Sequence, residues 1–245
     1  MRPVYLHAVA IADRRILAGP DGIEAWNPDG SLAAPDPRRF FPDQPRLGRL
    51  DLPSRFVLCA AGLLPAVPPD PDGTTAVVLG SSTGSLDSDL AFAASIADRP
   101  SPATYARTLP STAGAELAIV RGCRGPNFAI IQAGIPGLLA LAAAVHEIAS
   151  GPLDAFAFAG EYDAVSGEAG PGRAVLCLLG RRPDPAGRSR PVSIAREAAP
   201  MDGPGAGLEA LYGLFQEAPF DRSFVLEGTG TGSLVRVECG PRGAR

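Results

Sequence analysis

The stretch "NFAIIQAGIPGLLALAAAVHEIASG", residues 127–151, constrains the fold more than any other part of the chain. It contains a short apolar run, a turn of small residues, and a run rich in alanine and leucine that begins with proline and ends with glycine. This pattern predicts a buried strand followed by a helix. Many enzymes hold a nucleophile at the head of such a helix, yet this turn contains no Ser, Thr or Cys.

The central part of the chain repeats this alternation of strands and helices. Strands are predicted in "VYLHAVAIA", in the β-branched "TTAVVLG", and in "LDAFAFAGEYDA" and "RAVLCLLGRR". Helices are predicted in "SLDSDLAFAASIA" after a turn rich in glycine and serine, and in "STAGAELAIVRG" before a glycine stop. The order predicts one α/β domain over residues 1–245, with a mainly parallel sheet flanked by helices.

The flanking regions have weaker patterns. Residues 18–53 are rich in Pro, Gly and Asp and are expected to form an irregular insertion, after which Ser54 would cap a helix that stops at Pro65. Residues 183–245 are expected to form a C-terminal extension rich in loops. Within it we expect a surface loop over 183–206, a short helix over 207–218 and a hairpin over 223–239.

Composition excludes several classes of function. A net charge of -4 argues against nucleic-acid binding, and the absence of lysine removes Schiff-base chemistry. No apolar run reaches the ~18 residues of a membrane span, and no signal peptide is evident, so we expect a cytoplasmic protein. The four cysteines form no C-x-x-C pair, which favours reduced thiols over a disulfide or zinc site. No cofactor and no metal are expected.

The motif "GSSTG", Gly80–Gly84, matches the nucleophile elbow G-x-S-x-G and stands between a predicted strand and a predicted helix. A hydrolase would use Ser82, but it also needs a histidine base. His7 lies in the first strand, His146 is expected on a largely apolar helix face, and residues 151–245 contain no histidine. A glycine turn that satisfies a helix N-terminus is the favoured interpretation.

Two further motifs have structural explanations. The run "EGTGTG", residues 227–232, is similar to a phosphate loop but lacks the G-K-[ST] ending, which favours a hairpin turn. Glu161 and Asp163 follow a strand without a metal-ligating histidine nearby in sequence, so we expect them to cap a loop rather than to perform acid/base catalysis.

Three segments together resemble the N-terminal half of the β-ketoacyl synthases, the condensing enzymes of fatty-acid and polyketide assembly. They are residues 77–119, which end near a T-L-P stretch, residues 121–154, and "AFAFAGEYDA". In that family a G-P pair is followed by the catalytic cysteine and then by a G-L pair that begins a helix. Here Gly125 and Pro126 are followed, eight residues after the proline, by Gly134, and Gly137 and Leu138 supply the second pair. The resemblance implies a thiolase-like fold, N-terminal half only.

Glycine at the nucleophile position changes the implied activity. Condensation needs a thiolate to carry the acyl chain and histidines to polarise the malonyl thioester, and the family's histidines lie in its C-terminal half. The resemblance therefore implies a catalytically inactive subunit similar to a chain-length factor, as in aryl-polyene-type clusters. Some chain-length factors carry glutamine at the cysteine position. Gln132 lies two residues earlier, so that role is not transferred.

The resemblance also implies a partner. The strand before the nucleophile pairs across a dimer axis in this family, so Phe128, Ile130 and Gln132 are expected at an interface with a full-length β-ketoacyl synthase. Tyr105, Thr108 and Leu109 either line the partner's acyl tunnel or simply pack the interface. The alternatives are a homodimeric scaffold that binds acyl carrier protein, and the less favoured serine hydrolase.

Overall fold

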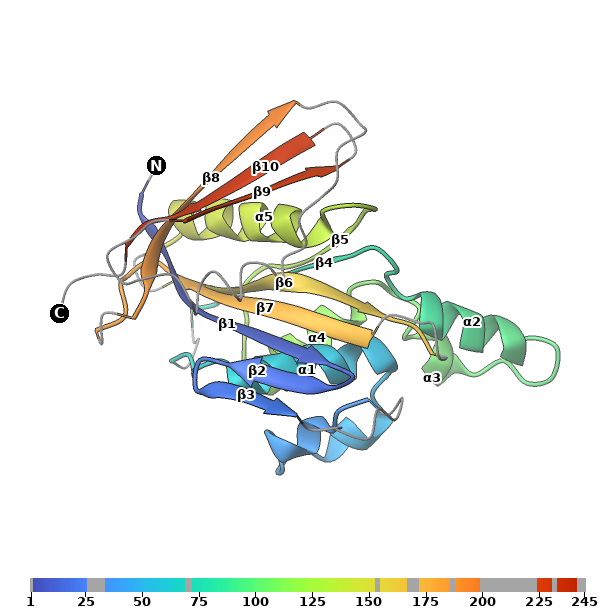
Figure 1. The fold of residues 1–245 in the computed structure, drawn as a ribbon. Coiled ribbons are helices and arrows are strands. Elements are labelled where there is room, and N and C mark those ends of the chain that lie inside the picture. Colours follow the sequence, from blue (N-terminus) through green and yellow to red (C-terminus); the bar gives the residue numbers. More distant parts are fainter. Residues whose placement is uncertain are drawn as a thin grey trace.

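The structure is a computed structural model that describes residues 2–25, 34–68, 72–152, 155–166, 172–185, 188–198, 224–230 and 233–241. A single sheet runs through the described residues in the order β5-β4-β6-β7-β1-β8-β10-β9, with β2 and β3 attached to β1 (Figure 1). The strands are β1 (Val4–Asp13), β2 (Ile16–Gly19), β3 (Gly22–Ala25), β4 (Thr75–Ser81), β5 (Asn127–Ile131), β6 (Phe156–Ala164), β7 (Gly172–Gly180), β8 (Arg190–Ala198), β9 (Phe224–Gly230) and β10 (Ser233–Cys239).

The sheet is mixed, so the expectation of a mainly parallel sheet was wrong. β4 pairs in parallel with β5 and β6, whereas the other seven pairings between described strands are antiparallel. For the pair β6–β7 the reason is the short connection, which spans only residues 165–171. A parallel crossover needs about a dozen residues or more, so these strands form an antiparallel pair.

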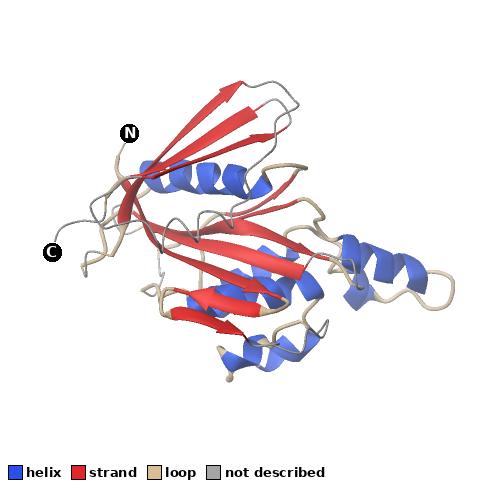
Figure 2. Cartoon of the chain, viewed as in Figure 1, coloured by secondary structure: helices blue, strands red, loops and turns tan. Residues whose placement is uncertain are grey.

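Helices cover both faces of the sheet (Figure 2). They are α1 (Leu52–Leu63), α2 (Leu86–Ser95), α3 (Pro102–Tyr105), α4 (Thr112–Arg121) and α5 (Pro136–Ser150), with short 3-10 helices η1 (Pro37–Arg39) and η2 (Pro45–Arg49). The apolar side of α5 packs in one buried cluster with residues of β4, β6 and β7. α1 and α4 pack in a second cluster on the opposite face. β8, β10 and β9 curve over α5, while α2 and α3 project to one side of the sheet.

The helix ends follow local sequence signals. α4 stops at Gly122, which adopts a left-handed conformation with φ of 69° and lets its N–H bond to the carbonyls of the last turn. α5 begins with Pro136 and stops at Gly151, as predicted. The predicted cap of α1 was wrong, because the Asp51 carboxylate accepts the N–H of Ser54 at 3.0 Å and the helix begins earlier.

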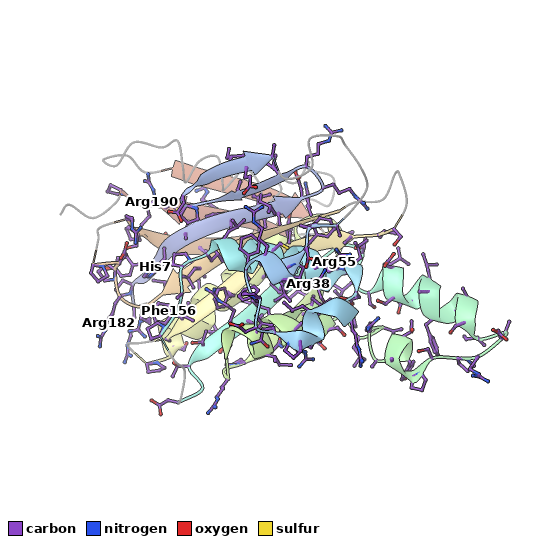
Figure 3. The ribbon with its side chains drawn as sticks, turned by 90° about the horizontal axis from the view of Figure 1, so that it is seen from below. His7, Arg38, Arg55, Phe156, Arg182 and Arg190 are labelled. Carbon is purple, nitrogen blue, oxygen red and sulfur yellow. The ribbon has the colours of Figure 1, made fainter. Side chains whose placement is uncertain are left out.

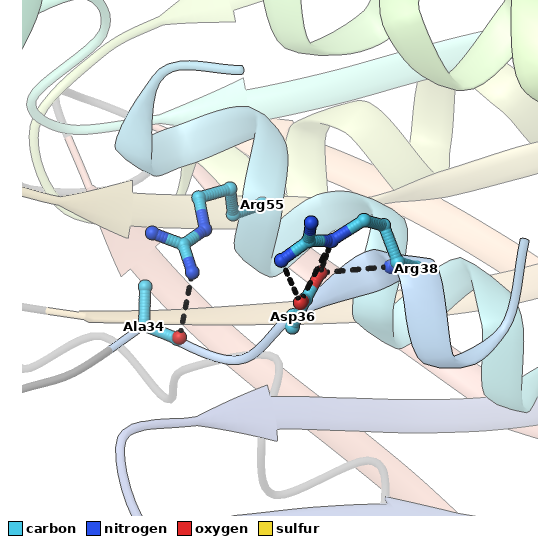
Figure 4. Close-up of polar contacts among 4 residues, drawn as sticks. All are labelled: Ala34, Asp36, Arg38 and Arg55. Atoms are coloured by element: carbon cyan, nitrogen blue, oxygen red, sulfur yellow. Dashed lines mark hydrogen bonds and ion pairs between the residues drawn. The ribbon is translucent and has the colours of Figure 1, made fainter. Parts of the chain in front are cut away.

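The described parts of residues 18–53 contain more regular structure than expected. They contain the hairpin formed by β2 and β3, followed by η1 and η2. The carboxylate of Asp36 caps η1 and pairs with Arg38, and Arg55 of α1 donates to the carbonyl of Ala34 at 3.0 Å (Figure 4). These contacts hold the segment that precedes η1 against α1.

The C-terminal region also differs from expectation. Arg190–Ala198 form β8 inside the segment expected to be a loop. The predicted hairpin is confirmed, since β9 and β10 pair in antiparallel register from Phe224↔Cys239 to Gly230↔Ser233. The helix expected over residues 207–218 lies outside the described residues.

β5 was predicted to be a buried strand, and the structure corrects this. Among the described strands it is the edge strand of the sheet, with only β4 beside it, and Phe128 and Ile131 are 42% and 47% exposed. β4, by contrast, is buried at all seven positions. The apolar character of β5 is therefore not explained by packing within this chain.

Candidate functional site

The turn between β5 and α5 joins the edge strand to a helix through Gln132, Ala133, Gly134 and Ile135. Gly134 lies exposed in this turn with φ of 98°, a conformation that side chains disfavour. The start of α5 packs directly on β4, because a Cβ on Gly80 would lie 2.2 Å from the Pro136 carbonyl oxygen. Glycine at position 80 is therefore what allows the strand and the helix to approach so closely.

Glu161 lies beneath the same helix N-terminus. Its side chain is 7% exposed, and a Cβ on Gly137 would lie 2.4 Å from one of its carboxylate oxygens. Arg173 of β7 forms an ion pair with this carboxylate at 3.5 Å. Because a helix N-terminus and a guanidinium both stabilise a negative charge, the arrangement gives Glu161 a structural explanation that requires no substrate.

The "GSSTG" turn closes around Asp163 of β6. One carboxylate oxygen, Oδ1, accepts the hydroxyl of Ser81 at 2.9 Å, the N–H groups of Ser82 at 2.9 Å and Thr83 at 2.8 Å, and the Thr83 hydroxyl at 2.9 Å. The Ser81 hydroxyl oxygen in turn accepts the N–H of Gly84 at 2.6 Å. The prediction that Asp163 caps a loop is confirmed. Towards the helix, the turn contributes the Thr83 carbonyl, which accepts the N–H of Leu86 at 3.1 Å, whereas Ser85 makes no side-chain cap bond.

Neither histidine lies near Ser82. Ser82 follows the C-terminal end of β4. His7 lies in β1 at the opposite end of the sheet, where its ring lies next to Gly180, the partner of Phe156. Since β4 is seven residues long, the two ends are about 20 Å apart. His7 bonds the carbonyl of Arg182 at 3.0 Å and contacts the ring of Phe156 (Figure 3). Burial lowers the His7 pKa, although the Arg182 carbonyl and the charge of Asp184 oppose the shift.

His146 was expected on an apolar face of α5, but its side chain is exposed. It lies eleven residues after Ile135, the residue that precedes α5, which places it about 16 Å further along the helix axis. The described residues contain no group of three or more His, Cys, Asp or Glu side chains arranged to hold a metal ion. Because both histidines lie far from Ser82, it has no histidine that could act as its general base, which argues against the hydrolase interpretation.

The described cysteines are free thiols. Cys59, Cys177 and Cys239 are buried and Cys123 is half-buried. Burial raises the pKa of Cys59 and of Cys239 to about 12, so these thiols stay protonated near neutral pH. Within the described part of the chain, no helix has the length and apolar character needed to cross a membrane.

β5 presents an unpaired backbone edge. Val77 donates its N–H to the Pro126 carbonyl at 2.8 Å, and Gln132 donates its N–H to the Ser81 carbonyl at 3.1 Å. These two bonds identify which residues of β5 bond to β4, because in a parallel ladder only alternate residues of an edge strand bond to the neighbouring strand. Asn127, Ala129 and Ile131 therefore direct their backbone groups away from β4. Such an edge is a template for pairing with another strand.

The exposed apolar side chains concentrate in one part of the sequence. Among the described residues, eight of the nine large hydrophobic side chains that are exposed come from the segment between α2 and β5. They are Leu86, Leu90, Ile96, Tyr105, Leu109, Ile119, Phe128 and Ile131. Exposed apolar groups in this number are typical of an interaction surface.

The structure places the residues singled out from the sequence as follows. Tyr105 and Leu109 are 61% and 58% exposed, while Thr108 is half-buried. Ile130 is partly buried against the α5 cluster. Gln132 is half-buried beside the turn that contains Gly134, and its side-chain nitrogen has no hydrogen-bond partner in the described structure.

Two anchoring residues were not found from the sequence. The hydroxyl of Tyr162 donates to the Pro110 carbonyl at 2.9 Å, and the hydroxyl of Ser85 donates to the Thr108 carbonyl at 2.6 Å. Both acceptors are more than twenty residues distant in sequence, so no local pattern identifies the pairs. The available signal for Tyr162 was a large side chain with a hydroxyl in a strand whose other members are mostly buried.

Comparisons with known proteins agree with this geometry. Residues 41–171 match the model of the β-ketoacyl synthase N-terminal domain, while no curated protein matches the sequence significantly. The fold is similar to that of the ishigamide ketosynthase/chain length factor, with a TM-score of 0.69 and 16% identity over 98% of this chain and 100% of that chain.

Two further solved structures are similar. One is the ketosynthase ApeO in complex with its chain length factor ApeC from Xenorhabdus doucetiae, with a TM-score of 0.60 and 16% identity over 97% of this chain and 99% of that chain. The other is AntDE:AntF, a type II polyketide synthase acyl-carrier protein in complex with its ketosynthase, with a TM-score of 0.65 and 11% identity over 98% and 99% of the two chains. The chain belongs to the β-ketoacyl synthase family and has its thiolase-like fold.

Proposed function

We propose that this chain is a non-condensing subunit, similar to a chain-length factor, that pairs with a full-length β-ketoacyl synthase in fatty-acid or polyketide biosynthesis of the aryl-polyene type. One observation carries the proposal. The turn between β5 and α5 holds Gly134, with a φ of 98°, directly beside an open apolar edge strand. An open edge strand beside a turn without a nucleophile supports a subunit that pairs with a synthase and does not condense.

The lack of condensing activity follows from the chemistry of this turn. A condensing enzyme forms a thioester on a cysteine thiolate and stabilises the enolate of the second substrate with positioned donors. Gly134 has no side chain to acylate. His7 and His146, the two histidines of the chain, lie far from it along the sheet and along α5. Neither half of the reaction has the groups that it needs in this chain.

Pairing through β5 accounts for the two unexplained features of this strand. A partner strand would satisfy the outward backbone groups of Asn127, Ala129 and Ile131, and it would cover the side chains of Phe128 and Ile131. The solved structures with similar folds include complexes of a ketosynthase with a chain length factor, which supports a ketosynthase as the partner. Phe128, Ile130 and Gln132 are the proposed interface residues.

Tyr105, Thr108 and Leu109 are proposed to face the partner's acyl tunnel. Tyr105 and Leu109 extend from α3 and the loop after it, and the ring of Tyr105 packs on Phe92 of α2 at 5.2 Å between centroids. Side chains that project into a tunnel set the number of carbon units that fit inside it. Their bulk would therefore influence product length without any chemistry in this chain.

The test is co-expression of the tagged chain with each β-ketoacyl synthase of the source genome, followed by purification and analysis of the acyl products. We expect a 1:1 complex with one synthase and a shift to shorter products for Leu109→Phe. Ile23→Phe is the matched control, because Ile23 is 67% exposed on β3 at the other side of the sheet. A purified homodimer without any synthase would favour the scaffold alternative. If the chain bound neither a synthase nor a second copy of itself, the proposed pairing would be refuted.

A further inference from the structure

The backbone on both sides of Leu109 is held by hydrogen bonds from three directions. The Thr108 carbonyl accepts the Ser85 hydroxyl at 2.6 Å, and the Pro110 carbonyl accepts the Tyr162 hydroxyl at 2.9 Å. The Leu109 carbonyl accepts the N–H of Thr112, which starts α4, at 2.9 Å. Three consecutive carbonyls are therefore bound by donors from three different elements: the turn before α2, strand β6 and the start of α4.

Both residues that donate these hydroxyl bonds are buried. Tyr162 is 2% exposed near the C-terminal end of β6, and Ser85 is 7% exposed in the turn before α2. The side chain of Ser85 makes no capping bond to α2, although Ser85 stands at the N-cap position. Its hydroxyl oxygen lies 2.6 Å from the Thr108 carbonyl oxygen and 3.1 Å from Oδ2 of Asp89, and the shorter contact to Thr108 takes its single proton.

Leu109 is the exposed residue between these anchors. Its side chain is 58% exposed, whereas Thr108 and Pro110 on either side are half-buried. A large apolar side chain on a fixed backbone loses little conformational freedom when a partner covers it. A flexible loop of the same sequence would have to be ordered at the moment of binding.

We propose that the hydroxyls of Tyr162 and Ser85 are positioning groups that present Leu109 as a preformed apolar anchor for the partner ketosynthase. This inference rests on the proposed function. It assigns to two buried residues, which do not touch the partner, a role in affinity and in product length. Tyr162 acts through the Pro110 carbonyl and Ser85 through the Thr108 carbonyl.

The first arm of the test uses the free chain. Hydrogen–deuterium exchange of peptides covering residues 106–113 is compared for the wild type, Tyr162→Phe and Ser85→Ala. Tyr162→Phe keeps the ring in the core and removes only the hydroxyl, so we expect exchange in this segment to rise about tenfold without loss of the fold. Tyr5→Phe on β1 is the matched control. Unchanged exchange in both variants would overturn the claim that the segment is held by these hydroxyls.

The second arm is a double-mutant cycle on the dissociation constant of the complex with the synthase that co-purifies with the chain. We expect Tyr162→Phe to weaken binding about five- to tenfold in the wild-type background and less than about twofold in the Leu109→Ala background. A merely structural role of Tyr162 would lower the melting temperature equally in both backgrounds and leave the dissociation constant unchanged.

The outcomes separate the two proposals. If no synthase binds the wild-type chain, the proposed function fails, and the anchor role fails with it. If the complex forms but Tyr162→Phe weakens it equally with and without Leu109, only the positioning role is overturned. Loss of affinity that depends on Leu109 would support both.

Discussion

Removal of the Asp163 carboxylate should destabilise the protein by about 2–4 kcal/mol, less than the sum of four separate hydrogen bonds. One oxygen of Asp163 accepts hydrogen bonds from the Ser81 and Thr83 hydroxyls and from the N–H groups of Ser82 and Thr83. In Asp163→Ala, water can reach the exposed N–H of Ser82, but the Ser81 side chain is fully buried and loses an acceptor. Hydrogen bonds to a charged acceptor contribute more than neutral ones, so most of the loss comes from the buried part of the network.

The measurement is thermal unfolding followed by circular dichroism at pH 7. For a chain of this size, 2–4 kcal/mol corresponds to a decrease of about 5–12 °C in melting temperature. Asp163→Asn keeps one carbonyl acceptor and should lose about half as much. Asp98→Ala, at an exposed position after α2, is the matched control and should change stability by less than about 0.5 kcal/mol. The reasoning is refuted if Asp163→Ala is as stable as Asp98→Ala.

Three further predictions follow from buried groups. Because burial lowers the His7 pKa below its usual value of 6.5, the unfolded chain binds the proton first, so the free energy of unfolding should fall between pH 7 and pH 5. The decrease should be smaller in His7→Gln, as measured by urea unfolding. At pH 8, iodoacetamide should label the half-buried Cys123 before Cys59, as read by mass spectrometry. Gly80→Ala should cost about 1–3 kcal/mol in denaturant unfolding, since its Cβ would clash with the Pro136 carbonyl.

Elements with local signals were predictable from the sequence. Pro136 and Gly151 bound α5, and Gly122 ends α4 in a left-handed conformation that favours glycine. The error at α1 has the same origin, since Asp51 and Ser54 are both good capping residues. Pro53 in the first turn is compatible with the earlier start, and the Asp51 carboxylate takes the cap.

Features that depend on distant pairing were not predictable. An apolar run such as that of β5 has the same pattern whether the core or another chain covers it, and only the strand order identifies it as an edge. The bonds from Tyr162 to Pro110 and from Ser85 to Thr108 join residues that come together only when α3 and the loop after it fold against β6 and the start of α2. The assignment of position 134 to the family's nucleophile rests on its spacing from Gly125–Pro126 and to Gly137–Leu138, and it stays a prediction.

The central claim is that β5 pairs with a ketosynthase, and native mass spectrometry of the co-expressed proteins with Ala129→Pro tests it most directly. The ladder phase directs the N–H of Ala129 away from β4, so proline removes no bond to β4 but blocks a partner strand. The account predicts a 1:1 complex for the wild type. It predicts that Ala129→Pro has a nearly unchanged melting temperature and does not bind the synthase. A complex that forms equally well with Ala129→Pro, or a wild type that binds no synthase, would contradict it.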